Sequence, residues 1–262
     1  MKNEKPLGRK AYGSIPHLPG SRRGPGDHGI EGGSARIATE KPRNKWDRVI
    51  VTEKLDGSCC AVAKVNGEIV ALGRAGYLAS TSPYEQHHLF AEFVEKKKHT
   101  FDRLLEEGER VVGEWMAQAH GTRYDLRVDY PFFMFDIMRG PKRALHEEVA
   151  SRCWDVHAAM PKVLHNGPPL SIDDAMDLLG EFGHHGATDP VEGAVWRVEG
   201  KKRPDAPVKL DFLCKYVRPD KVDGCYLPEE TGGEIVWNWE RYYPDESVKR
   251  CPHCTGRLEE GA

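Results

Sequence analysis

The sequence predicts an α+β fold with mainly antiparallel sheets and inserted helices. Short runs of β-branched and aromatic residues recur along the chain and are typical of strands. Two of these runs are joined by Asn66-Gly67, which is a strong signal for a β-hairpin. The helical patterns fall between strands at irregular intervals, which differs from the regular alternation of a parallel α/β fold.

The first 48 residues are rich in glycine, proline and charge. Up to residue 45 we expect a loop, either a flexible arm or a lid over a charged ligand. Residues 49–51 are a predicted strand, and residues 59–65 are expected to be its neighbour in the sheet. The strand over 58–65 turns at Asn66-Gly67 into a strand over 68–73.

The middle of the chain changes between helical and strand periodicity. Apolar residues from Leu89 to Val94 share one helical face, and a second short helix is expected to end at Gly108. The remaining predicted elements are strands over 110–116 and 131–138, helices near 146–159 and 172–182, and strands over 192–198 and 208–217.

Length and composition indicate a globular protein without membrane spans. With 262 residues, 39% of them hydrophobic, the chain can bury a core as one domain or two small ones. It has no apolar run of about 20 residues, so we expect no membrane span. The first residues lack the apolar region of a signal peptide, and seven cysteines without regular spacing suit a reducing compartment. A cytoplasmic location is therefore expected.

Basic residues are concentrated in two segments of a chain whose net charge is −3. Residues 1–48 hold eleven Lys or Arg against five acids, which gives +6. Residues 196–221 hold eight against four, which gives +4. Such local charge suits a confined site for a polyanion, although basic segments are common in ordinary proteins.

Lys54 stands at the end of an apolar strand and is followed by Leu55-Asp56-Gly57. A lysine half shielded from water loses its proton more readily and can act as a nucleophile. Gly57 would let a phosphate approach the backbone. A surface lysine before an ordinary Asp-Gly turn would have the same local sequence.

Four later strands also carry polar residues within or beside apolar runs, where charge is costly without a partner or a function. Each has an ordinary explanation on its own: an edge-strand acid, an aromatic core cluster, a Glu-Gly turn or a lysine reaching for water. The key residues of these strands are Glu114, Phe135 with Asp136, Glu192 and Lys215.

In this order the residues resemble the motifs of the covalent nucleotidyltransferase superfamily, which includes ATP-dependent RNA and DNA ligases and mRNA capping enzymes. The resemblance covers about residues 49–219. The matching motifs are Lys54-Leu55-Asp56-Gly57, Gly73-Arg74-Ala75-Gly76, Gly113-Glu114-Trp115, Phe133-Met134-Phe135-Asp136, Glu192-Gly193-Ala194-Val195 and Leu213-Cys214-Lys215-Tyr216-Val217.

The resemblance implies a nucleotidyltransferase (ATP-grasp-like) domain over 49–219, in which Lys54 attacks the α-phosphate of ATP and releases pyrophosphate. The attack requires a depressed pKa at Lys54. By the same resemblance, Lys215 would contact the α-phosphate and Glu192 would help to position Mg²⁺ or Mn²⁺. Glu114 and Arg74 would bind the ribose hydroxyls and phosphates. Phe135 would stack on the adenine, and Glu53 would accept a hydrogen bond from the adenine amino group.

One feature departs from the family pattern, and another separates its subfamilies. In the family, the last of these motifs (motif V, here Leu213-Cys214-Lys215-Tyr216-Val217) often carries a second lysine. This chain has Leu213 at that position, and Lys209 or Arg218 would have to replace the lysine. Only 47 residues (262 − 215) follow Lys215, too few for the roughly 100 residues of the OB-fold found in DNA ligases and capping enzymes. We therefore expect no OB-fold and an ATP-dependent RNA ligase similar to bacterial and phage enzymes.

The expected substrates are ATP and RNA ends with a 5′-phosphate and a 3′-hydroxyl, guided by the two basic segments. An end-processing kinase or phosphatase is a conceivable partner, and the oligomeric state is not predicted. A DNA ligase, a GTP-using capping enzyme and a non-catalytic module that binds nucleotides or RNA ends remain the alternatives. The upstream Ile15-Pro16-His17-Leu18-Pro19-Gly20-Ser21 also resembles the RNA ligase group, with no role assigned.

The short C-terminal segment, residues 220–262, contains the pair Cys251 and Cys254. This pair resembles half of a zinc ribbon. A closed zinc site needs four ligands, and Cys225 is the only other cysteine nearby in the sequence. An unfilled pair is therefore expected, with Zn²⁺ as the alternative.

Overall fold

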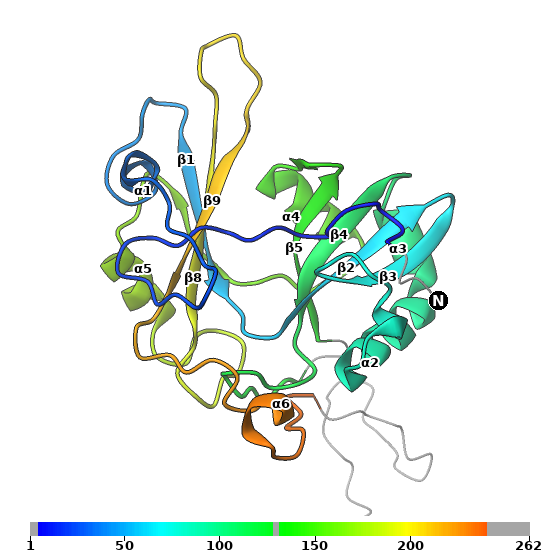
Figure 1. Ribbon diagram of the computed structural model, residues 1–262. Coiled ribbons are helices and arrows are strands. Elements are labelled where there is room, and N and C mark those ends of the chain that lie inside the picture. Colours follow the sequence, from blue (N-terminus) through cyan, green and yellow to red (C-terminus); the bar gives the residue numbers. More distant parts are fainter. Residues whose placement is uncertain (1–4, 128–130, 240–262) are drawn as a thin grey trace, which may run out of the picture.

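The computed structural model describes residues 5–127 and 131–239, which form two antiparallel sheets side by side (Figure 1). The four-stranded sheet has the order β7 (Val163–Gly167), β1 (Arg48–Lys54), β8 (Gly193–Gly200) and β9 (Lys209–Val217). The five-stranded sheet has the order β3 (Glu68–Gly73), β2 (Ser58–Val65), β4 (Glu109–Trp115), β5 (Phe132–Arg139) and β6 (Lys142–Arg143). This confirms the α+β class with antiparallel sheets.

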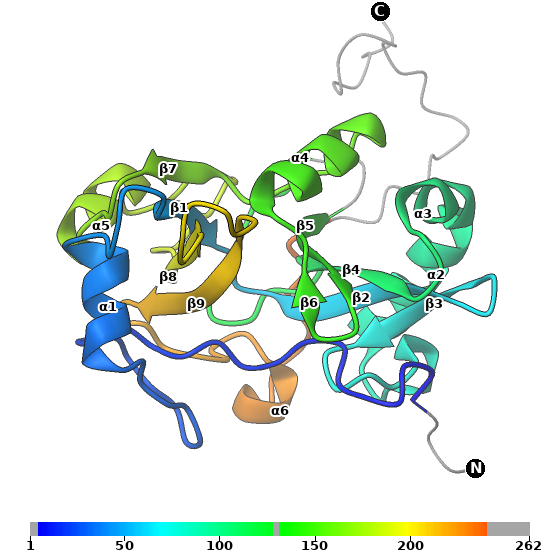
Figure 2. The ribbon, with the colours of Figure 1, turned by 90° about the horizontal axis from the view of Figure 1, so that it is seen from above.

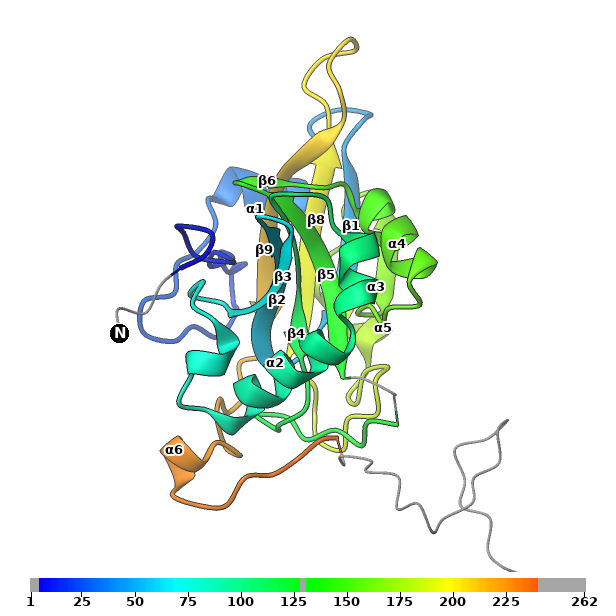
Figure 3. The same cartoon turned by 90° about the vertical axis from the view of Figure 1, so that its right-hand side faces the viewer.

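Helices cover one face of each sheet (Figure 3). The five-stranded sheet packs against α2 (Glu85–Lys96), α3 (Lys98–Leu104) and α4 (His146–Asp155) around an aromatic core that includes Phe90, Phe93 and Trp115. The four-stranded sheet packs against α1 (Gly32–Thr39) and α5 (Ile172–Leu179). Two shorter helices are η1 (Ala79–Thr81) and α6 (Pro228–Thr231).

Strands β1 and β2 lie in different sheets, so the expectation that they are neighbours is wrong. β1 pairs with β7 and β8, whereas β2 pairs with β3 and β4. Between them the chain crosses from one sheet to the other. Leu55 anchors this crossing in a small core with Met116 and Tyr124, which a pattern of apolar and polar residues does not specify.

The hairpin at Asn66-Gly67 is confirmed. Both residues have positive φ, 53° and 76°, as a two-residue hairpin turn requires. The loop predicted over 1–45 is wrong at α1, whose Ala35 and Ala38 pack on the four-stranded sheet. The glycine pair at its start, Gly32-Gly33, hid this helix from sequence analysis because glycine disfavours helices.

The N-terminal segment crosses in front of both sheets in the view of Figure 1 and runs along one side of them in Figure 2. Tyr12 is buried against the five-stranded sheet, and residues 16–22 hydrogen-bond to β9. In the described part of the chain, no helix is long and apolar enough to cross a membrane.

Candidate active site

The register of the strands brings the predicted motifs to one place. Lys54 at the end of β1 pairs with Gly193, which follows Glu192 at the start of β8. Cys59 in β2 pairs with Glu114 in β4. Val195 in β8 pairs with Lys215 in β9. The motifs therefore meet where the chain crosses between the two sheets.

A cavity of about 570 Å³ opens between the sheets at this crossing. Its volume is in the range of sites for small ligands. The sequence-predicted residues that border it are Glu53, Lys54, Arg74, Glu114, Phe135 and Lys215. Glu192 joins the site through its contact with Lys54.

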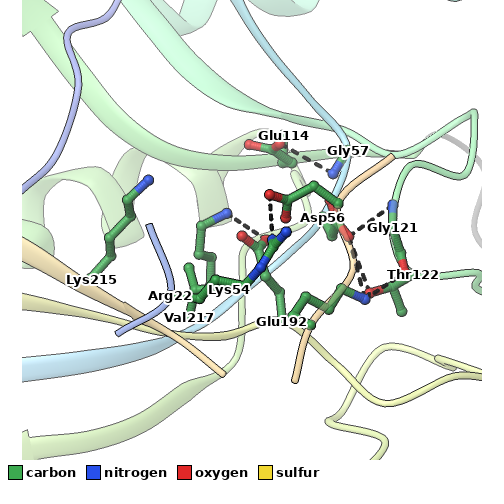
Figure 4. Close-up of polar contacts among 12 residues, drawn as sticks. Arg22, Lys54, Asp56, Gly57, Glu114, Gly121, Thr122, Glu192, Lys215 and Val217 are labelled. Carbon is green, nitrogen blue, oxygen red and sulfur yellow. Dashed lines mark hydrogen bonds and ion pairs between the residues drawn. The ribbon is translucent and has the colours of Figure 1, made fainter. Parts of the chain in front are cut away.

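Lys54 lies among carboxylates (Figure 4). Its Nζ donates to Glu192 Oε2 at 2.6 Å. Burial lowers the pKa of Lys54, but the carboxylates of Glu192, Glu114 and Asp56 outweigh burial, and the net direction is upward. The prediction of a depressed pKa at Lys54 is thus wrong for the protein alone, because the charges near Lys54 are mainly negative.

Two acids beside Lys54 hold their protons more tightly than usual. Burial raises the pKa of Glu192. Burial also raises the pKa of Glu114, to about 7; the charges of Glu192 and Asp56 add to this shift, and that of Lys54 opposes it. The pKa of the amine and those of the acids rise together because several carboxylates surround one ammonium. Glu114 also accepts a hydrogen bond from the Gly57 N–H at 3.2 Å.

Asp56 is held by a network that sequence analysis missed. Its Oδ2 accepts hydrogen bonds from the Gly121 N–H at 3.1 Å and the Thr122 hydroxyl at 3.2 Å. The buried Nζ of Lys221 lies 3.6 Å from the same oxygen and donates to the Gly121 carbonyl at 2.6 Å. Lys221 ends the basic segment 196–221, but nothing in its local sequence marks it as a partner of Asp56.

Gly57 borders the cavity and is also required for packing. A Cβ at this position would lie 2.6 Å from the Trp115 carbonyl oxygen and 2.8 Å from Met116 Sδ. The crossing chain therefore runs too close to the end of β4 for any larger residue.

Glu53 borders the cavity, but its carboxylate accepts a hydrogen bond from the His184 N–H at 2.9 Å. Successive side chains on a strand point to opposite faces, so Glu53 and Lys54 diverge. This placement argues against the adenine contact predicted for the Glu53 side chain.

Phe135 and Arg74 lie on the side of the cavity formed by the five-stranded sheet and the N-terminal segment. The Phe135 ring packs edge-on against Tyr12, with centroids 5.4 Å apart. Arg74 Nη2 lies 3.4 Å from the Gly13 carbonyl oxygen, and the side chain is exposed. Both residues border the cavity and can contact a ligand there.

Lys215 reaches the cavity from β9 with its side chain 19% exposed. Burial and the neighbouring Lys54 lower the pKa of Lys215, although Asp27 and Glu192 oppose them. Among the residues that line the cavity are neither Lys209 nor Arg218. Arg197 does line it, from β8.

A divalent cation fits the acids of this site. Mg²⁺ usually takes one or two carboxylates and completes its shell with phosphate oxygens and water. Among the described residues, no group of three or more His, Cys, Asp or Glu side chains forms a complete metal cage. Glu192 beside the cavity suits the first arrangement. Cys251 and Cys254 lie outside the described residues.

Comparisons with known proteins match the chain to a family and to several solved structures. A family model described as RNA ligase matches residues 47–217. No curated protein sequence matches. An apo mutant of a Naegleria gruberi RNA ligase has a similar fold, with 13% identity, a TM-score of 0.51 and coverage of 80% of this chain and 57% of that chain.

Two further solved structures resemble the chain over part of its length. An archaeal ATP-dependent RNA ligase is 22% identical, with a TM-score of 0.40 and coverage of 65% of this chain and 42% of that chain. A Naegleria gruberi RNA ligase with PPi is 16% identical, with a TM-score of 0.46 and coverage of 66% and 50%. The chain spans about half the length of these proteins.

Proposed function

This chain belongs to the RNA ligase family, and we propose that it is an ATP-dependent RNA ligase that forms a lysyl-AMP bond at Lys54. The observation that carries the proposal is the placement of Lys54 beside a ligand-sized cavity, with Glu192 at 2.6 Å and Lys215 on the edge strand β9 of the same sheet. We assign catalysis to residues 49–219, flanked by the N-terminal segment and the short C-terminal segment.

In the first step the Lys54 amine attacks the α-phosphorus of ATP, and the bond to the β-phosphate breaks with release of pyrophosphate. The Lys54 ammonium donates to Glu192 Oε2 at 2.6 Å and must lose a proton to solvent before it attacks. A bound Mg²⁺ or Mn²⁺, held through Glu192, would supply positive charge that lowers the pKa of Lys54.

The other residues are assigned by their places around the cavity. Lys215 would stabilise charge that develops on the α-phosphate. Phe135 and Val195 line the cavity from opposite sheets and offer apolar surface to adenine, where stacking is worth about 1–3 kcal/mol. Glu114 and Arg74 would bind the ribose hydroxyls and phosphates.

The later steps define the ligase. AMP would pass from Lys54 to an RNA 5′-phosphate, and a 3′-hydroxyl would then attack that end and release AMP. The basic segments 1–48 and 196–221 would bind the RNA backbone, since positive charge provides affinity for phosphates without reading sequence.

A labelling assay tests the first step. The full chain is incubated with α-labelled ATP or GTP and a divalent cation, then separated under denaturing conditions. We expect a covalent label from ATP that disappears in Lys54→Ala and on chelation of the metal. Lys142→Ala, an exposed lysine on β6, is the matched control and should label normally.

The same assay separates the alternatives. A label from GTP alone would indicate a capping enzyme, and no label from either nucleotide would leave a binding module. Persistent label in Lys54→Ala would show that another residue is the nucleophile. Sealing of nicked RNA but not nicked DNA by the labelled protein is the outcome expected for an RNA ligase.

A further inference from the structure

Residues 15–30 form a strap along the edge of β9. The Lys215 N–H donates to the Pro16 carbonyl at 3.0 Å, and the Leu18 N–H donates to the Lys215 carbonyl at 2.8 Å. Farther along, the Arg22 N–H donates to the Val217 carbonyl at 3.0 Å. The strap therefore extends the four-stranded sheet beside the cavity lysine. It contains the sequence motif over residues 15–21, which the proposed function leaves without a role.

His17 lies at the centre of the strap and is 1% exposed. Its Nδ1 lies 2.7 Å from Ser21 Oγ, and its Nε2 lies 3.1 Å from Asp27 Oδ2. Ser21 Oγ also accepts a hydrogen bond from the Val217 N–H at 2.9 Å and donates to the Arg22 carbonyl at 3.3 Å. The two ring nitrogens thus face Ser21 and Asp27.

Asp27 connects the imidazole to the cavity. Its Oδ1 lies 4.0 Å from Lys215 Nζ, while its Oδ2 faces His17 and accepts a hydrogen bond from the Gly24 N–H at 3.0 Å. The carboxylate thus lies between a buried imidazole and a lysine that borders the cavity.

A purely structural role does not explain this set of residues. The backbone hydrogen bonds already attach the strap to β9, and an apolar side chain could fill the space of His17 at no electrostatic cost. A buried imidazole needs partners for its polar atoms, and one partner of this imidazole is a carboxylate beside Lys215.

We propose that His17 and Asp27 are positioning residues for Lys215: His17 orients the Asp27 carboxylate, which holds the Lys215 ammonium at the edge of the cavity in its charged form. The catalytic consequence rests on the proposed function, in which Lys215 contacts the α-phosphate. The electrostatic coupling between Asp27 and Lys215 does not depend on that function.

The charges around Lys215 give the direction of the effect. Burial lowers the pKa of Lys215, as do Lys54 on β1 and Arg74 beyond β3, whereas Asp27 on the strap and Glu192 before β8 raise it. His17 faces Asp27 rather than Lys215 Nζ. Loss of the Asp27 charge would leave Glu192 as the remaining acid in this balance, so Lys215 would lose its proton at lower pH.

The coupling is tested by NMR titration of the full chain labelled with 13Cε-lysine, with Lys215 assigned by its missing signal in Lys215→Arg. In Asp27→Asn, we expect the titration midpoint of Lys215 to fall by about 1 pH unit, the effect of an opposite charge about 4 Å away. Asp223→Asn is the matched control, since Asp223 pairs with Arg22 of the same strap. An unchanged midpoint in Asp27→Asn would overturn the proposal.

The consequence for catalysis is tested by single-turnover labelling with saturating ATP across a pH series. The alkaline limb of Asp27→Asn should move to lower pH by about 1 unit, which is an about tenfold loss of rate on that limb. His17→Gln, which keeps a donor for Asp27, should retain more rate than His17→Ala. A profile identical to wild type in folded Asp27→Asn would overturn the positioning role. If wild type gives no label, the proposed function fails, and the titration still decides the coupling.

Discussion

Two separate features of the structure determine the position and the charge of Lys54, the proposed nucleophile. Its position at the end of β1 follows from strand register, but its charge depends on Glu192, Glu114 and Asp56. These carboxylates stabilise the ammonium, so attack requires that their influence be reduced. Positive charge brought by a nucleotide-bound cation would act in that direction.

Glu114 provides a test of this electrostatic cluster. Its pKa rises from an ordinary value of 4.5 to about 7, so between these pH values the folded protein binds more protons than the unfolded chain. The stability that Glu114 contributes therefore falls as pH rises through this window. At pH 8 we expect Glu114→Gln to be more stable than wild type by about 2 kcal/mol, with a smaller difference at pH 5.

Urea unfolding at the two pH values measures this difference. The exposed α2 variant Glu95→Gln is the control and should show little change in its stability relative to wild type. A difference between Glu114→Gln and wild type that is the same at pH 5 and pH 8 would contradict the raised pKa.

At the scale of elements, sequence analysis predicted what depends on local chemistry. The Asn66-Gly67 hairpin and most strands and helices follow from turn residues and periodicity over a few positions. The separation of β1 and β2 into two sheets was missed because it depends on Leu55 packing against distant residues. Side chains alternate between the two faces of a strand, so the sequence alone could have predicted that Glu53 and Lys54 point in opposite directions.

The β8–β9 hairpin projects beyond the sheet and lies beside the loop before β1, which ends the first basic segment (Figure 1). Lys201 Nζ lies 5.3 Å from the Trp46 ring centroid, and Lys45 Nζ lies 5.5 Å from it. Arg43 in the N-terminal segment pairs with Asp211 of β9 at 2.6 Å. This arrangement supports a common role for both segments in binding RNA phosphates.

Removal of charge from the hairpin tip tests that role. Lys202→Ala with Arg203→Ala should weaken RNA binding and reduce the slope of log K against log salt by about 2, because each phosphate contact contributes about one. Fluorescence anisotropy over a salt series measures the slope. The control, Lys96→Ala with Arg103→Ala on α2 and α3, removes equal charge from exposed positions elsewhere. Equal losses of RNA affinity in both double variants would refute a specific role of the hairpin. ATP labelling should be unaffected in either double variant.

At the scale of the whole molecule, Asp136 joins the parts that enclose the cavity. Its Oδ1 accepts a hydrogen bond from Arg197 Nη1 of the four-stranded sheet at 3.0 Å. Its Oδ2 accepts from Arg143 Nε at 2.9 Å and from the Tyr12 hydroxyl of the N-terminal segment at 2.9 Å. The carboxylate is 1% exposed and follows Phe135 directly. The two walls of the cavity are thus connected through one buried acid.

Asp136→Ala should therefore destabilise the whole molecule by about 3–5 kcal/mol, because the buried charge of Arg197 and the partly exposed charge of Arg143 both lose this partner. Chemical denaturation measures this loss. Asp205→Ala is the control, since Asp205 and Arg203 form a pair whose side chains are both 75% exposed, and its effect should stay below about 1 kcal/mol. Equal stability of the two variants would show that the sheets are held together without Asp136. Labelling with ATP should slow in folded Asp136→Ala, since Phe135 and Val195 line the cavity from sheets that this contact holds in place.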